Sequence, residues 1–412
     1  MISSNYNSFY YCFIRNFFFA LAYFIGAFAV LMFFLRFTNN QTVFNRDSFM
    51  HWDAIHYEHI AHIDYLGFRT AFFPLFPLIW KILRCGIYGV VLFNGILFIF
   101  SASLLVTFFK FSAEEFLIIL SFPSLIFLFL PYTESVFFFS VALALIGMSK
   151  QNNWIIFVGM LLASCTRPVV YVFIPAVIIL NIIENRKLTL QRFIFLILPI
   201  LLGIILVFFI QYFNTHDYFA FFHSQKMWNN YLQIPKFHLT SWGGDDIVKL
   251  DGSAFLVGII ATVAIAYFAF KKSTIGESMK QEPTLFSIIY LAGICWFVLF
   301  TRGGSLFSLN RFVFATPFFF LGFSALLKKS WTTREYVLIF LLLNVFWLLL
   351  GSYVHIVETL KYLALSVFVM LFLFISHPNK YISKISYSVC LIGNIFLQLY
   401  FYNSFLHNGW VG

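Results

Sequence analysis

Long apolar runs recur along the chain of 412 residues, separated by short polar connections. A helix that crosses the hydrocarbon core of a bilayer needs roughly 20 mainly apolar residues. This criterion predicts an all-α polytopic membrane protein. The number of transmembrane helices is about 11–13, because some adjoining runs can form one broken helix. The predicted spans lie near residues 16–37, 86–109, 115–130, 134–149, 154–166, 168–183, 193–213, 253–270, 284–301, 312–327, 336–353, 362–376 and 385–403.

Composition supports a membrane protein and excludes several other classes. The chain is 61% hydrophobic and 22% aromatic but only 10% charged, whereas an ordinary soluble domain is about 25% charged. Its five cysteines are scattered without a C-x-x-C pair, so neither a zinc site nor a disulfide framework is expected. We expect residues 1–412 to form one integral-membrane domain.

Basic residues indicate how the chain is oriented. If the N-terminus is cytoplasmic, the cytoplasmic connections hold fourteen lysines and arginines and the short loops opposite hold four. Short loops follow the positive-inside rule and long ones escape it, so the long loops 38–85 and 214–252 are expected outside, in a periplasm or lumen. The net charge of +10 is thus a topology signal and does not indicate nucleic acid. The cytoplasmic set is Arg15, Lys110, Lys150, Arg186, Lys187, Arg192, Lys271, Lys272, Lys280, Lys328, Lys329, Arg334, Lys380 and Lys384, and the outer set is Arg167, Arg302, Arg311 and Lys361.

The first outer loop is the most informative segment. Apolar residues at a spacing of three to four between His51 and Tyr65 predict an amphipathic helix on the membrane surface. Asp53 falls in its first turn, where it is either a functional carboxylate or merely an N-terminal cap. Trp52 is equally open to two interpretations, as a substrate contact or as an interfacial anchor. The apolar set is Trp52, Ile55, Tyr57, Ile60 and Ile63.

Four histidines in this loop raise the possibility of a metal site. His56, His59 and His62 recur every three residues, so they drift around a helix and match no metalloprotease pattern. A solvated interfacial face explains them better, and no metal is predicted. Farther on, Pro74 and Pro77 prevent a regular helix through Pro74. That segment is either the wall of a cavity or a kinked start of the next span.

Other outer motifs carry charge into apolar surroundings. Glu134 follows a Pro-Tyr-Thr turn, and Arg167 lies between Thr166 and a proline at a predicted helix break. A cation within the membrane is by default a functional candidate. The alternative is that Arg167 is purely structural and forms an ion pair with Glu134. Arg302 and Arg311 lie in one outer turn, and the planar guanidinium suits a phosphate. The glycines of that turn match no Walker pattern and are interpreted as turn formers.

The second long loop has aromatic and polar residues that suit sugar binding and suit any interfacial loop as well. A further surface helix is predicted over residues 218–230, followed by the turn Trp242-Gly243-Gly244.

Taken together, these motifs resemble the PIG-V family of mannosyltransferases, the GPI mannosyltransferase 2-like proteins. The second half of the chain agrees mainly by hydropathy and by Asn310-Arg311-Phe312. His51 departs from the family pattern, which usually has an arginine before Trp-Asp. The matching motifs in the first half are Trp52-Asp53, Ile60-Ala61, Tyr65, Ala71-Phe72-Phe73-Pro74 with Pro77-Leu78, Pro131-Tyr132-Thr133-Glu134 and Thr166-Arg167-Pro168.

The resemblance implies a GT-C-type membrane glycosyltransferase. Such an enzyme transfers a hexose, here mannose, from a polyprenyl-phosphate donor to a glycolipid or glycan acceptor at the outer face. Eukaryotic members add the second mannose of the GPI anchor in the endoplasmic reticulum from dolichyl-phosphate mannose. Bacterial relatives occupy the inner membrane, and the short loops of this chain favour a bacterial member. No cofactor is implied beyond the lipid-linked sugar, which is a co-substrate.

In such an enzyme we expect Asp53 to act as the base or to orient the acceptor hydroxyl. We expect Arg167 and Arg311, and after them Arg302, to bind the lipid phosphate, and a single displacement to invert the anomeric configuration. Glu134 and Asp64 are expected either to orient the substrate or to pair with these arginines. The other residues expected at the site are Trp52, Asp64, Glu134, Arg167, Arg302 and Arg311. A transporter or flippase of lipid-linked saccharides is the alternative, because buried cations also serve the passage of an anionic headgroup. A noncatalytic subunit is disfavoured by Asp53 and the arginines occurring together.

Overall fold

The computed structural model describes residues 2–37, 45–184, 190–270, 282–351 and 355–412. Within these ranges the regular structure is helical, apart from one isolated bridge between Thr240 and Ser305. The basic residues Arg186, Lys187, Lys271, Lys272 and Lys280 lie outside the described ranges. The elements are α1 (Ile2–Phe37), η2 (Asp47–Phe49), α2 (Asp53–His62), η3 (Gly67–Ala71), α3 (Leu75–Leu83), α4 (Ile87–Phe108), α5 (Ala113–Leu120), η4 (Pro123–Phe129), α6 (Glu134–Ser149), α7 (Asn153–Thr166), η5 (Pro168–Val172), α8 (Phe173–Glu184), α9 (Leu190–Thr215), α10 (Ala220–Met227), α11 (Asp245–Phe270), α12 (Glu282–Thr301), α13 (Leu309–Phe314), α14 (Pro317–Leu327), α15 (Thr333–Phe346), η6 (Trp347–Leu349), α16 (Ile356–Phe374) and α17 (Lys380–Leu406).

The chain is an all-α, multi-pass membrane protein, as its sequence predicts. Among the described residues, seven helices are long and apolar enough to cross a membrane, within α1, α4, α9, α11, α12, α16 and α17. Each predicted span falls on helical structure where it is described; positions 352 and 353 of the span 336–353 lie outside the described residues. The remaining spans are shorter helices, for example α7, α8 and α14. In the described ranges the length criterion is thus met by seven helices, or by up to eight if η4 and α6 form one bent span, against the predicted 11–13.

Breaks in the backbone explain the short helices. η4 and α6 meet at an angle of 100° across the turn that contains Pro131. α7 ends at Thr166, and Arg167 is extended at φ −150° before Pro168 begins η5. Proline disfavours helical backbone at the preceding residue, so the predicted break at Arg167 is confirmed. These interruptions leave polar residues at helix ends, where they face one another.

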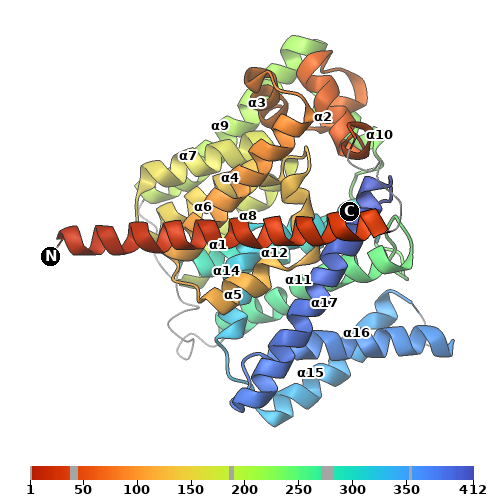
Figure 1. Ribbon diagram of the computed structural model, residues 1–412. Coiled ribbons are helices and arrows are strands. Elements are labelled where there is room, and N and C mark those ends of the chain that lie inside the picture. The colour runs from red at the N-terminus through yellow and green to blue at the C-terminus, as the bar shows by residue number, and fades with distance from the viewer. Residues whose placement is uncertain (1, 38–44, 185–189, 271–281, 352–354) are drawn as a thin grey trace.

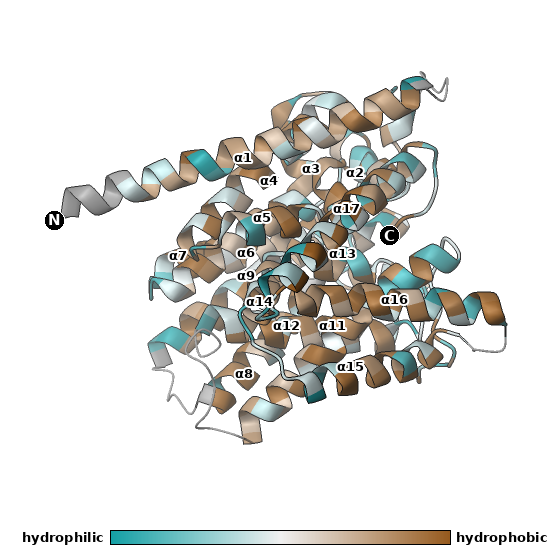
Figure 2. Cartoon of the chain, turned by 60° about the horizontal axis from the view of Figure 1, so that its bottom comes forward, coloured by the Kyte–Doolittle hydropathy of each residue, from teal (hydrophilic) through white to brown (hydrophobic). Residues whose placement is uncertain are grey.

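The helices pack closely through small residues. A Cβ added at Gly159 of α7 would lie 2.5 Å from the backbone nitrogen of Ala144 in α6. A Cβ at Gly258 of α11 would lie 2.3 Å from the Cβ of Cys295 in α12. Such small residues let helix backbones approach each other in membranes. Hydrophobic residues dominate the stacked helices α11, α12, α15 and α16 (Figure 2).

The first and second outer loops meet at one end of the bundle, where α2, α3 and α10 lie together at the top of Figure 1. The hydroxyl of Thr70 donates to the carbonyl of Ala220 at 2.9 Å, and the indole of Trp228 donates to the carbonyl of Phe68 at 3.1 Å. The helices predicted near residues 51–65 and 218–230 are confirmed as α2 and α10. α3 begins at Leu75, directly after Pro74. This agrees with the expectation that no regular helix runs through Pro74.

The inward-facing side of α2 differs from the predicted apolar set. Ala54, Tyr57 and Ala61 are buried, whereas Ile55 and Ile63 are 49% and 73% exposed. The small alanines let the helix lie close to its neighbours, and Tyr57 packs edge-on against Phe76. Ile55 and Ile63 therefore point away from the rest of the protein.

Candidate functional site

A chain of ion pairs joins four residues from different parts of the sequence. Arg311 Nη1 lies 2.9 Å from Asp53 Oδ2, and Arg311 Nε lies 2.8 Å from Glu134 Oε1. The same Glu134 oxygen is 3.3 Å from Arg167 Nη2. The structure thus brings Asp53, Glu134, Arg167 and Arg311 together, with two carboxylates balancing two guanidinium groups.

Asp53 reaches this cluster because of how α2 begins. Trp52 precedes the helix at φ +53°, a backbone region that bulky residues rarely adopt. The helix start carries no side-chain cap hydrogen bond, so the interpretation of Asp53 as an N-terminal cap is wrong. The carboxylate turns to Arg311 instead and keeps 23% of its side chain exposed. It is therefore paired and still reachable.

Glu134 is the buried centre of the cluster. Its side chain is inaccessible to solvent, and Arg167 and Arg311 are 5% and 3% exposed. The structural alternative for Glu134, as partner of Arg167, is thus an observed contact. Glu134 Oε2 and Arg167 Nη1 are buried without a hydrogen-bond partner among the described residues. Buried polar atoms are normally satisfied, so the cluster retains hydrogen-bonding capacity for another molecule.

Arg311 is a firmly charged group. Burial lowers the pKa of Arg311, but the carboxylates of Glu134 and Asp53 raise it by more, and the net shift is upward. Its guanidinium also lies over the ring of Tyr132 at 4.6 Å and donates to the carbonyl of Gly412 at 3.2 Å. With its donors used in this way, Arg311 serves mainly to hold the two carboxylates.

Asp251 fixes the backbone that carries Arg311, a role that the sequence analysis missed. Its Oδ1 accepts from the backbone nitrogen and the Nδ2 of Asn310, at 2.8 and 2.7 Å. Its Oδ2 accepts from the hydroxyl of Ser241 at 2.5 Å. Asp251 is completely buried. The available signal was a carboxylate two residues before the predicted span 253–270.

Arg302 differs from the other two arginines. Within the described part of the chain it forms no ion pair with a carboxylate; its Nη1 donates to the carbonyl of Phe307. Burial lowers the pKa of Arg302 to about 9, against the opposing attraction of Asp251. Gly303 and Gly304 have φ of +57° and +96°, so the predicted turn formers are confirmed. Arg302 is the cation here with the least countercharge.

The remaining sequence candidates lie in other contacts. Asp64 pairs with Arg69 at 3.3 Å and with His59 at 3.4 Å, so of its two expected roles the pairing with the site arginines is not observed among the described residues. Arg69 and His59 are close to Asp64 in sequence, and they pair with it in place of the distant site arginines. His56 packs against Phe72 at 4.9 Å. Among the described residues, no group of three or more histidine, cysteine, aspartate or glutamate side chains is arranged to hold a metal.

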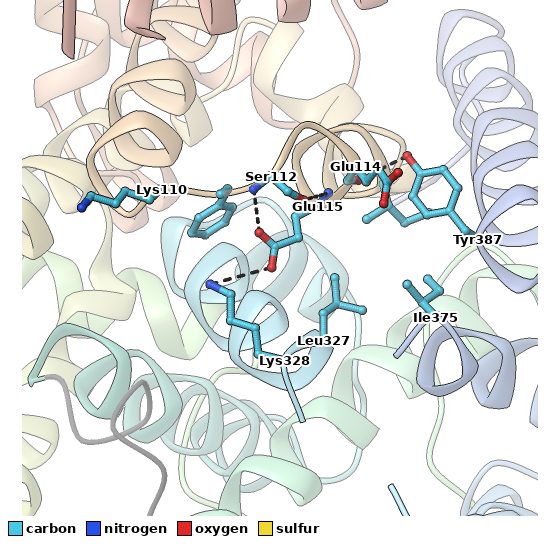
Figure 3. A pocket seen from close by; sticks show the side chains of 10 residues that line it. Lys110, Ser112, Glu114, Glu115, Leu327, Lys328, Ile375 and Tyr387 are labelled. Atoms are coloured by element: carbon cyan, nitrogen blue, oxygen red, sulfur yellow. Dashed lines mark hydrogen bonds and ion pairs between the residues drawn. The ribbon is translucent and has the colours of Figure 1, made fainter. Parts of the chain in front are cut away.

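A cavity of about 390 Å³ lies beyond the other end of α4, between α5, α14 and α17. In Figure 3, Glu115 accepts from the backbone nitrogen of Ser112 at 2.8 Å and faces Lys328 at 3.8 Å. These residues are on the predicted cytoplasmic side, and the cavity is separate from the Asp53 cluster.

No family model matches the chain, and neither a curated protein nor a solved structure matches it. The resemblance to PIG-V mannosyltransferases therefore stands on the quoted motifs.

Proposed function

We propose that the protein is an inverting membrane glycosyltransferase. It transfers a hexose, mannose by resemblance, from a polyprenyl-phosphate donor to a hydroxyl of a glycolipid or glycan. The reaction takes place at the outer face of the membrane, in the periplasm or in the lumen of the endoplasmic reticulum. The observation that carries the proposal is a reachable Asp53, held by Arg311, in the same outer region as Arg302, which has no carboxylate partner in the described part of the chain.

The chemistry needs few groups. The acceptor oxygen forms a bond to the anomeric carbon, and the bond from that carbon to the phosphate oxygen breaks. The hydroxyl proton passes to Asp53, and the electron pair of the broken bond stays on the departing polyprenyl phosphate. Asp53 Oδ2 is fixed by Arg311, while Oδ1 accepts no hydrogen bond among the described residues. Oδ1 is therefore the oxygen that takes the proton.

Arg302 is the best-supported ligand for the phosphate. The phosphodiester of the donor carries one negative charge and gains a second as polyprenyl phosphate departs, so it is stabilised most by a cation that has no carboxylate partner among the described residues. Arg167 and Arg311 already share Glu134. The guanidinium of Arg302 lies over Phe307, with its central carbon 3.7 Å from the ring centroid. The stacking holds the guanidinium in place.

An apolar cavity beside Arg302 supports a donor with a lipid chain. The cavity has a volume of about 540 Å³ and is lined by Leu232, Gln233, Ile234, Pro235 and Phe300. Backbone hydrogen bonds of 2.7 Å from Gln233 to Phe300 and 3.0 Å from Lys236 to Gly303 attach this loop to the turn that carries Arg302. A polyprenyl chain placed there has its phosphate within the same turn.

The proposal is tested by sugar transfer in detergent. The purified protein is incubated with radiolabelled polyprenyl-phosphate mannose and membrane lipid extract, and labelled products are separated by chromatography. A glycosyltransferase forms a new labelled glycolipid or glycan with an α linkage from a β-linked donor. A transporter or flippase leaves the donor unchanged, and that result, obtained with donor binding intact, would refute the enzymatic proposal.

A further inference from the structure

A row of aromatic rings extends from Arg302 to Asp53. We call it the aromatic wall, and it comprises Phe307, Trp242, Trp410 and Trp52. The ring of Trp242 stacks on Phe307 with centroids 4.5 Å apart and an interplanar angle of 10°. Trp410 contacts Trp242 at 5.2 Å and Trp52 at 4.9 Å. Because Trp52 directly precedes Asp53, the wall connects the proposed phosphate ligand to the proposed base.

Four separate segments of the chain contribute to this wall, and the backbone is shaped to join them. Gly243 has φ +85°, and a Cβ there would lie 2.8 Å from the carbonyl oxygen of Trp410. The backbone carbonyls of Val411 and Gly412 accept from Asn310 at 3.4 Å and Arg311 at 3.2 Å. The residues around Trp410 are therefore held against the ion-pair cluster. Neither Trp242 nor Trp410 was singled out by the catalytic argument.

The wall combines apolar faces with hydrogen-bond donors that have no acceptor. The indole nitrogens of Trp52 and Trp410 are buried and unpartnered among the described residues. Trp242 is 47% exposed. The positive φ of Trp52 is a conformation that costs about 1–3 kcal/mol and is typical of functional sites. A pyranose ring matches this surface, because its C–H face is apolar and its hydroxyl oxygens accept hydrogen bonds.

We propose that the aromatic wall binds the pyranose ring of the donor. This inference rests on the proposed function, since it takes the donor phosphate to lie at Arg302. A sugar attached to that phosphate lies along the exposed part of Trp242, and its anomeric carbon is then between Arg302 and Asp53. Trp410 and Trp52 donate their indole N–H groups to the sugar hydroxyls.

The test compares two phosphodiester probes of equal charge that differ only by the sugar, methyl citronellyl phosphate and mannosyl citronellyl phosphate. Affinities are measured by isothermal titration calorimetry on the full-length protein in detergent. The wild type should bind the mannosyl probe more tightly. Trp410→Ala should weaken binding of the mannosyl probe about tenfold, as expected for a lost aromatic contact and hydrogen bond, and leave the affinity for methyl citronellyl phosphate unchanged. Trp410→Phe, which keeps a ring but loses the donor, should fall between.

Trp331→Phe is the matched control, because its indole nitrogen is also buried and unpartnered and Lys329 lies 3.7 Å from its ring, on the predicted cytoplasmic side. This variant should bind both probes as the wild type does. Equal affinities of the wild type for the two probes, or an equal loss for both in Trp410→Ala, would overturn the inference. Sugar-dependent binding without any transfer would instead refute the enzymatic proposal and leave the wall as a sugar-binding surface.

Discussion

The guanidinium of Arg311 lies 2.9 Å from the carboxylate of Asp53, although 258 positions separate the two residues in the sequence. The contact ties the first outer loop to the short helix α13 between α12 and α14. Since Arg311 is 3% exposed and Asp53 is 23% exposed, the pair has one buried and one reachable end. The proposed reaction needs a carboxylate that is oriented by a buried partner and still within reach of an acceptor hydroxyl.

Removal of Arg302 should weaken donor binding most. For Arg302→Ala we expect the KM for the polyprenyl-phosphate sugar to rise about ten- to a hundredfold, the range of a lost charge-assisted hydrogen bond. Arg302→Lys keeps the charge but loses the planar fork and should be intermediate. Steady-state kinetics with the labelled donor measures both. Arg46→Ala, which removes an arginine paired with Glu58 at 2.7 Å, is the control and should leave KM unchanged.

Glu134→Gln should destabilise the protein strongly. The variant leaves Arg311 with Asp53 as its carboxylate partner and leaves Arg167, which is 5% exposed, with none among the described residues. Breaking a buried pair in this way costs about 3–5 kcal/mol. The unfolding midpoint in detergent should therefore fall by several degrees. Glu358→Gln removes a carboxylate that is 28% exposed and pairs with Lys361 and Lys249 near the surface, and it should shift the midpoint far less. Equal midpoints for the two variants would show that Glu134 does not hold the cluster together.

Asp251→Ala should lower the activity without touching the substrates. The change leaves the backbone and side-chain N–H groups of Asn310 without their acceptor, at a cost of about 1–3 kcal/mol for each unsatisfied group. α13 then shifts and carries Arg311 with it. Circular dichroism melting and transfer assays should both respond. Asp246→Ala, on the same helix but exposed, is the matched control; comparable losses there would argue against a positioning role for Asp251.

Orientation is tested by cysteine labelling in intact cells. In a background with the native cysteines replaced, Ile234→Cys should react with a membrane-impermeant maleimide from outside, since Ile234 is 89% exposed in the second outer loop. Lys380→Cys, at the start of α17, should react only after permeabilisation. The opposite pattern would place the Asp53 cluster on the cytoplasmic side and exclude a periplasmic or luminal reaction.

Much of the architecture was predictable because the length of each apolar run can be counted in the sequence. The boundaries of α6 and α7 agree with the predicted segments 134–149 and 154–166 to within one residue. The inward face of α2 was not predictable from hydrophobicity. Ala54 and Ala61 are buried there because their small side chains allow the neighbouring elements to pack closely. The grouping of Arg167 with Glu134 followed from the cost of an unpaired buried charge.

Other features of the site depend on tertiary contacts between distant segments. Asp251 bonds to a backbone nitrogen 59 positions away, and no local pattern reveals such a partner. Trp410 meets Trp52 only because the chain after α17 returns to the start of α2. Asp64 was expected at the site but pairs with Arg69, since a neighbouring cation is available before any distant one.

The most direct measurement is mannosyl transfer by Asp53→Asn beside the wild type, with the affinity for methyl citronellyl phosphate and the unfolding midpoint recorded for both. The substitution keeps the size of the side chain but removes the group that accepts the proton. We expect transfer to fall at least about a hundredfold, while phosphate binding at Arg302 persists. Transfer within about twofold of the wild type, outside the range of general-base catalysis, would contradict the assignment of Asp53 and the enzymatic account built on it.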